Sequence, residues 1–144
     1  MTRLLSLLFL LFSVVSFAQE DEEVHSIFFE FDKYNLKEEQ ANAVVAFVSK
    51  IDTSRIESVQ IFGYCDDRGK DQYNYTLSTN RANTVKNKLI ERGINSKIII
   101  TLEGKGRFML DAVMRTNVPE ACTKNRRVNA VVNFKPIVID DFKL

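Results

Sequence analysis

A carboxylate and a guanidinium in this sequence have the chemistry to hold the two ends of an amino acid. Asp66 follows an apolar segment that ends at Gly63, and Arg81 lies in the periodic segment that comes next. An aspartate can accept hydrogen bonds from an ammonium group, and an arginine can bind a carboxylate through two parallel bonds. The same pair could instead form a salt bridge between a loop and a helix, worth about 0–1 kcal/mol if exposed. The residue types alone leave both possibilities open.

Alternating strand and helix patterns would position these two residues. In the segment before Gly63, Val59 and Ile61 alternate with polar residues, which predicts a strand. Ligands in open α/β sheets bind beyond the carboxyl ends of strands, and Asp66 follows the end of this one. Arg81 lies on a helix that Gly93 should end, because glycine readily adopts positive φ. The order β-α-β-α-β-β predicts an α/β (α+β) two-layer sandwich, a mixed sheet with helices on one face. The expected elements are a strand at 24–31, a helix at 36–50, a strand at 58–63, a helix at 71–92, and strands at 97–102 and 128–134.

Composition indicates one globular domain and argues against a polyanionic partner. The chain has 144 residues, of which 45% are hydrophobic and 27% are charged. Lys+Arg number 20 and Asp+Glu number 19, so the formal net charge is +1. Proteins that bind nucleic acid usually carry a strong basic excess. We therefore expect no nucleic-acid partner.

Residues 1–18 have the pattern of a secretory signal peptide. Arg3 precedes an apolar run, and the small residues Ser16 and Ala18 suit a cleavage site between Ala18 and Gln19. The run is shorter than the roughly 20 apolar residues that a membrane-spanning helix needs. No cysteine follows it that could carry a lipid. We expect export to the periplasm and no transmembrane span in the mature chain, with an acidic linker at 19–23, one domain at 24–136 and a C-terminal tail at 137–144.

The two cysteines, Cys65 and Cys122, both lie in the part expected to be exported. In an oxidising compartment an even number of cysteines suggests a disulfide, which would add roughly 4 kcal/mol in the chain-entropy model. Alternatively, Cys65 could be a nucleophile activated by His25, the only histidine. No strained glycine-rich turn surrounds Cys65. We therefore expect the disulfide.

Short motifs along the chain together resemble one known family. They are Phe29, Phe31 and Asp32; Gly63-Tyr64-Cys65-Asp66; Asn74, Leu77-Ser78 and Arg81-Ala82; and Asn125-Arg126-Arg127-Val128. In these residues and their spacing the chain resembles the OmpA-like C-terminal domain over about residues 24–134. This peptidoglycan-associating module is also found in Pal lipoproteins and in flagellar-stator MotB proteins.

The resemblance implies a ligand and a set of binding residues. Family members bind the diaminopimelate-containing stem peptide of peptidoglycan without cleaving it. By resemblance, Asp66 would hold the diaminopimelate ammonium and Arg81 its carboxylate. The remaining implied site residues are Asn74, Arg126, Asn35, Leu77 and Ser78. An outer-membrane or other envelope protein is a further possible partner, and no cofactor is implied.

The sequence departs from the family pattern at the rim of this pocket. Tyr64 replaces the usual histidine, Cys65 replaces the usual threonine, and the segment 107–121 lacks the common Gly-Glu-x-x-Pro pattern. In the family fold Cys122 would lie beside the same pocket. A Cys65–Cys122 bridge would then hold the long 105–125 connection against the binding strand.

Two other functions remain as alternatives to wall binding. One is an enzyme that acts on the cell wall with Cys65 as its nucleophile, and the other is an adaptor that keeps the fold without binding the wall. A hydrolase with paired carboxylates needs two acids that frame a cleft, whereas Asp66 and Asp67 are adjacent. These acids also lack the calcium-loop pattern, so we expect neither catalysis nor a metal site.

Overall fold

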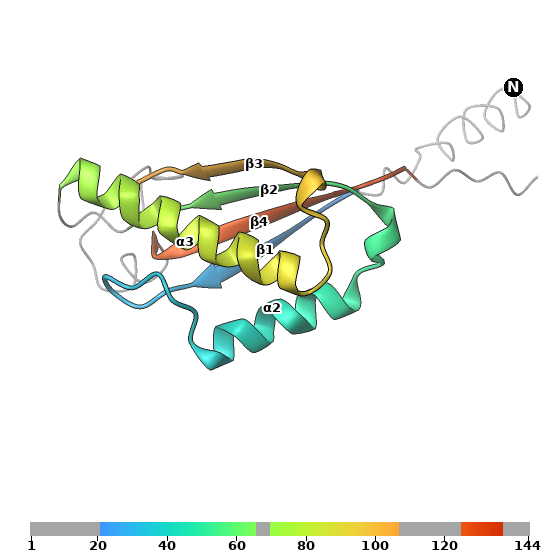
Figure 1. Cartoon of the computed structure of the whole chain (residues 1–144), viewed down its shortest axis with the longest axis horizontal. Helices are drawn as coiled ribbons and strands as arrows, with labels where there is room; N and C mark the ends of the chain where they lie inside the picture. Colours follow the sequence, from blue (N-terminus) through green and yellow to red (C-terminus); the bar gives the residue numbers. More distant parts are fainter. Residues whose placement is uncertain (1–20, 66–69, 107–124, 137–144) are drawn as a thin grey trace, which may run out of the picture.

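The computed structural model describes residues 21–65, 70–106 and 125–136 (Figure 1). The chain forms β1 (Glu22–Phe28), α2 (Glu38–Lys50), β2 (Ile56–Gly63), α3 (Asp71–Glu91), β3 (Ile99–Gly104) and β4 (Arg127–Phe134). Short 3₁₀ turns at Thr53–Arg55 and Ser96–Ile98 lead into β2 and β3. The expected signal peptide, Asp66, Cys122, most of the 105–125 connection and the C-terminal tail lie outside the described residues.

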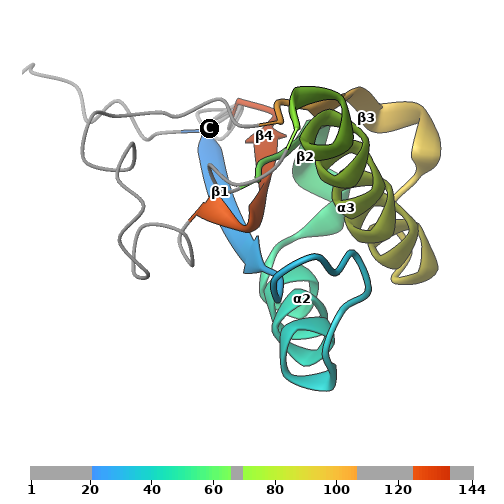
Figure 2. The same cartoon turned by 90° about the vertical axis from the view of Figure 1, so that its left-hand side faces the viewer.

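The strands form one mixed sheet in the order β1-β4-β2-β3. β4 pairs antiparallel with both β1 and β2, and β3 pairs parallel with β2. Figures 1 and 2 show α2 and α3 on the same face of this sheet. The expected two-layer arrangement, with a mixed sheet and helices on one face, is therefore confirmed.

The core lies between the sheet and the two helices. Val44 and Val48 of α2 are buried, and Phe47 and Ile51 pack against the same core. These four residues follow one another at i, i+3, i+4 and i+7, so they form one stripe on the helix that faces the sheet. Burying an aliphatic side chain of this size contributes about 1.5–3 kcal/mol. Most of the other core residues come from alternate strand positions and one face of α3: Ile27, Val59, Ile61, Val128, Ala130, Val132, Ala82, Val85 and Leu89.

The first strand is shorter than expected. β1 ends at Phe28 and not at Phe31. The Phe29 N–H still donates to the Arg126 carbonyl at 2.8 Å. Beyond it the backbone turns, and Asp32 has a left-handed φ of 58°. Aromatic residues in this segment therefore belong to a loop, even though their types favour a strand.

Other element boundaries also differ from those expected by one or two residues, and two of these differences have a local cause. The first helix begins at Glu38 because Lys37 is its N-cap and has an extended backbone, with φ −64° and ψ 153°. β3 begins at Ile99 because the preceding residues form a 3₁₀ turn, in which the Asn95 side chain accepts from Lys97 N. Gly93 has φ 99° after α3, as a helix C-terminus often requires.

None of the helices in the described ranges is both long and apolar enough to cross a membrane.

Two glycines let α3 lie directly against the ends of two strands. A Cβ atom placed on Gly63 would lie 2.1 Å from the Ser78 carbonyl oxygen. One placed on Gly104 would lie 2.2 Å from Thr79 Oγ1 and 2.6 Å from Thr79 N. Because backbone atoms cannot move aside independently, any side chain here would push the helix away from the sheet.

We predict that Gly63→Ala destabilises the domain by about 3 kcal/mol or more, because overpacking against backbone forces a helix shift. Gly93→Ala is the control: it has open space around it and should cost only its left-handed backbone conformation, roughly 1–2 kcal/mol. Urea unfolding of both variants measures the difference. Equal destabilisation of the two would contradict the close helix approach.

The single histidine belongs to the core side of β1. The His25 ring stacks on Phe47 of α2, with centroids 4.5 Å apart and planes 9° apart. Its Nε2 is buried and has no hydrogen-bond partner in the described part of the chain. Burial lowers the pKa of His25 below its ordinary 6.5 because desolvation disfavours the charged ring.

This lowered pKa predicts a pH dependence of folding stability. The unfolded chain binds the His25 proton near pH 6.5, whereas the folded chain binds it only at lower pH. The contribution of neutral His25 to the free energy of unfolding is therefore fully present above pH 6.5. It is lost as the pH falls from 6.5 toward the pKa of the folded state. We expect the urea midpoint to fall more between pH 7.5 and 5.5 in the wild type than in His25→Phe. The same pH dependence in both proteins would contradict this assignment.

Candidate ligand-binding site

One end of the sheet gathers the chain segments that carry the predicted site residues. In the pairing register, Gly63 lies between Val128 and Gly104, and Val128 also pairs with Ile27. The segments stay hydrogen-bonded beyond the strands. Each of the following backbone bonds measures 2.8 Å: Phe29 N to Arg126 O, Tyr64 N to Arg127 O, Cys65 N to Gly106 O, and Lys105 N to Gly63 O.

The first half of α3 faces this end of the sheet. Four site residues lie on its inner face at i, i+3, i+4 and i+7, and all are buried: Asn74, Leu77, Ser78 and Arg81. The Ser78 hydroxyl accepts from Gly106 N at 2.9 Å and donates to Tyr75 O at 2.9 Å. The Asn74 carbonyl accepts from the Cys65 thiol at 3.1 Å. The helix is thus bonded both to the residue after β2 and to the turn after β3.

Arg81 is almost completely buried, with only 1% of its surface exposed. Its Nε donates to Lys33 O at 2.7 Å, its Nη2 to Glu30 O at 3.0 Å, and its Nη1 to Tyr64 O at 3.1 Å. Nη1 also lies 3.7 Å from Cys65 Sγ. The guanidinium carbon lies 5.4 Å from the centre of the Phe29 ring. One side chain therefore joins α3, the end of β2 and the loop that follows β1.

A guanidinium as buried as that of Arg81 requires these hydrogen bonds. A buried charge is tolerated only when its donors are hydrogen-bonded. A guanidinium suits this position because it carries several donors in a fixed plane and stays charged. The described acceptors are backbone carbonyls, which have no net charge. These carbonyls hold the Arg81 guanidinium in a fixed place at the end of the sheet.

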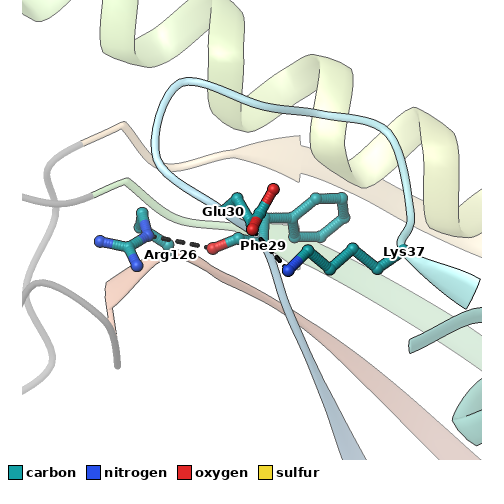
Figure 3. A network of polar contacts seen from close by, with 4 residues as sticks. All are labelled: Phe29, Glu30, Lys37 and Arg126. Atoms are coloured by element: carbon teal, nitrogen blue, oxygen red, sulfur yellow. Dashed lines mark hydrogen bonds and ion pairs between the residues drawn. The ribbon is translucent and has the colours of Figure 1, made fainter. Parts of the chain in front are cut away.

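Arg126 and Asn35 lie at the β1 side of this region. Arg126 is half-buried, and its Nε donates to Phe29 O at 3.0 Å (Figure 3). The neighbouring Glu30 forms a 2.5 Å ion pair with Lys37, which lowers the pKa of Glu30. Asn35 lies exposed in a bend of the same loop. Because both members of the Glu30–Lys37 pair are exposed, this pair adds little stability.

A second buried arginine was not among the predicted site residues. Arg127 is 6% exposed, and its guanidinium carbon lies 4.7 Å from the centre of the Tyr64 ring. Desolvation lowers the pKa of Arg127, and burial raises the pKa of Tyr64. Tyr64 is the residue that replaces the usual histidine. This replacement and the adjacent arginines Arg126 and Arg127 were the sequence features that could have indicated an arginine–tyrosine contact. Asn125 before them is also buried.

The predicted Cys65–Cys122 disulfide is not supported. Cys65 is buried, with its sulfur against Asn74 O and the Arg81 guanidinium, and Cys122 lies outside the described residues. The proposed activation of Cys65 by His25 gains no support either. His25 stacks on Phe47, whereas Cys65 lies beyond the end of β2.

The structure therefore brings together Asn74, Leu77, Ser78, Arg81 and Arg126, with Asn35 on the adjoining loop. Asp66 lies outside the described residues, so its pairing with a ligand or with Arg81 stays a prediction. Among the described residues, no group of three or more His, Cys, Asp or Glu is placed to hold a metal ion.

A separate cavity of about 520 Å³ lies at the opposite end of the sheet. It is lined by Asp21, Glu23, Lys50, Ile51, Asp52, Arg55 and Phe134. Acids and bases are mixed around it, and Asp52 Oδ1 already accepts from Ser54 N and Oγ. None of the predicted site residues lines this cavity.

Known proteins match the chain across this region. Residues 28–126 match the OmpA family model. The chain is 35% identical over 101 residues to "Outer membrane protein A" of Bordetella avium, covering 70% of this chain and 50% of that protein. It is 28% identical over 81 residues to the "Peptidoglycan-associated lipoprotein" of Pasteurella multocida, covering 56% and 54%. The chain thus spans about half the length of the curated relatives it matches.

The fold is also found in solved structures. The OmpA-like domain of FopA1 from Francisella tularensis superimposes with a TM-score of 0.64 at 28% identity, covering 83% of this chain and 80% of that one. The family model covers the segment from the end of β1 to the start of β4, which contains every described site residue. Sequence match and architecture agree: the chain belongs to the OmpA family.

Proposed function

We propose that this domain binds peptidoglycan non-covalently in the periplasm and so anchors or localises a protein at the cell wall. The observation that carries the proposal is the buried, positively charged Arg81 at the sheet end where the segments after β1, β2 and β3 converge. The printed name of the Pasteurella relative, a peptidoglycan-associated lipoprotein, supports the same ligand. Export through a signal peptide cleaved between Ala18 and Gln19 is part of this proposal.

The ligand we propose is the diaminopimelate-containing stem peptide. Its free end is a zwitterion, so it requires one acidic and one basic group at a fixed separation. Arg81 contacts Tyr64 O and Cys65 Sγ. Asp66 is the next residue, and consecutive Cα atoms are only about 3.8 Å apart. This position of Asp66 in the sequence, directly after Cys65, supports Asp66 for the ammonium and Arg81 for the carboxylate.

The surrounding residues would complete the pocket. Low local polarity strengthens the attraction between Arg81 and a carboxylate compared with the same pair in water. Asn74, Ser78 and Arg126 supply polar groups at the pocket wall, Leu77 supplies apolar surface, and Asn35 lies on the exposed loop. In this account the domain holds its ligand and performs no reaction on it, consistent with a Cys65 thiol that is only 2% exposed.

We predict that Asp66→Ala weakens binding to purified diaminopimelate-type sacculi roughly ten- to hundredfold, the effect of losing a hydrogen bond to a charged group. Arg81→Lys keeps the charge but loses the planar donor set, and it should weaken binding as well. Asp67→Ala is the matched control, because it removes an equal charge from the adjacent position. Sedimentation of the domain with sacculi over a concentration series measures the affinities.

Sacculi whose stem peptides contain lysine in place of diaminopimelate test the ligand itself. Lysine lacks the second carboxylate, so binding should fall to the level of Asp66→Ala. Equal binding to both wall types would contradict the proposed clamp. Soluble fragments released from the sacculi would point instead to the enzyme alternative.

A further inference from the structure

The loop between β1 and α2, residues 29–37, has no regular secondary structure and yet is extensively bonded. Its backbone carbonyls accept from side chains of other elements. Arg126 Nε donates to Phe29 O at 3.0 Å, Arg81 donates to Glu30 O at 3.0 Å and to Lys33 O at 2.7 Å, and Thr84 Oγ1 lies 2.6 Å from Tyr34 O. Three of these acceptors are held by α3, the helix that carries most of the proposed pocket.

Hydrophobic burial does not explain how the middle of this loop is held. Phe29 is buried and Leu36 packs partly against the core, but these residues lie near the two ends. Between them Phe31 is 55% exposed and Tyr34 is 53% exposed. Polar bonds from α3 therefore contribute to holding the central backbone, together with the bond from Lys33 N to Glu30 O at 3.2 Å within the loop and the exposed Glu30–Lys37 pair.

Tyr73 provides a further hydrogen bond at Asp32, the residue of the loop with a positive φ. Its hydroxyl donates to the Asp32 side chain. Asp32 has φ 58°, a left-handed conformation that most residues avoid and that aspartate tolerates better. Tyr73 itself is 52% exposed, so this hydroxyl does little for the core. Its described polar contact is with the loop.

We propose that Tyr73 and Thr84 are positioning residues: with Arg81, they hold the 29–37 loop as a preformed wall of the peptide site. This inference rests on the proposed function, because the wall matters only if a ligand binds beside it. A loop that must become ordered when the ligand binds costs affinity, and a loop fixed in advance avoids that cost. The bonds would also keep Asn35 at a constant place relative to Arg81.

Conservative substitutions on α3 can test this because the helix offers matched controls. Thr84→Val removes the bond to Tyr34 O, and Tyr73→Phe removes only the hydroxyl. Thr84 Oγ1 also lies 3.0 Å from Asn80 O in its own helix. Thr76 makes the same kind of intrahelical contact, 3.0 Å to Gln72 O, so Thr76→Val controls for its loss. Tyr75→Phe controls for Tyr73→Phe, because Tyr75 is 53% exposed on the same helix.

Two measurements are needed on each variant of the full mature chain: amide hydrogen exchange of residues 29–37, and affinity for diaminopimelate-type sacculi. We expect loop exchange to accelerate and affinity to fall roughly two- to tenfold in Thr84→Val and in Tyr73→Phe. The two control variants should match the wild type. Thr84→Ser should restore both readouts, and the urea midpoints should stay within the range of the controls.

The outcomes separate this inference from the proposed function. Loop exchange unchanged in both test variants would overturn the inference, as would faster exchange without any loss of affinity. If the wild-type chain fails to sediment with sacculi, the proposed function is wrong and the role in binding falls with it. Hydrogen exchange still decides in that case whether the helix holds the loop.

Discussion

The buried guanidinium of Arg81 is the constraint on which this end of the molecule depends. A charge that is 1% exposed must have its donors satisfied, and here backbone carbonyls of Glu30, Lys33 and Tyr64 do so. These carbonyls come from two separate segments, so one side chain fixes the position of both relative to α3. The segments can come this close because Gly63 and Gly104 leave no side chain between the helix and the strand ends. Helix packing and loop conformation are therefore coupled at the place where we expect the ligand.

The same end of the sheet gathers three arginine side chains, of which two are buried and one is half-buried. Arg81 lies on the inner face of α3, Arg127 stacks on Tyr64, and Arg126 donates to Phe29 O from the β1 side. Arginine tolerates this better than lysine because its planar donors bond carbonyls and its face stacks on aromatic rings. For the ligand that we propose, these side chains would be held in place before binding.

Much of this architecture follows from local patterns in the sequence. The alternation at Val59 and Ile61 and the stripe at Val44 and Val48 each identify a buried face, because strand and helix periods differ. The length of β1 could not be predicted in this way, because the aromatic residues after Phe28 favour a strand. The last bond between this segment and the β4 side, from Phe29 N to Arg126 O, depends on the tertiary structure.

The candidate site was predictable as a set of residues but not as a set of contacts. The motif spacing places Asn74, Ser78 and Arg81 on one helical face. Nothing local shows that Arg81 bonds to backbone carbonyls, because any residue type can supply a carbonyl. The expected disulfide rested on cysteine count and compartment, which carry no geometry. The contact between the Cys65 sulfur and Asn74 O could not be predicted from either. The stacking of Arg127 on Tyr64 likewise depends on positions that only the folded sheet brings together.

The most direct test of the account is a nuclear magnetic resonance titration of the isotope-labelled domain with a soluble stem peptide that contains diaminopimelate. The account predicts that shift changes concentrate at the Arg81 side chain, at Cys65 and Asn74, and along the 29–37 loop. No change there, or changes confined to the opposite end of the sheet around Arg55 and Phe134, would contradict it.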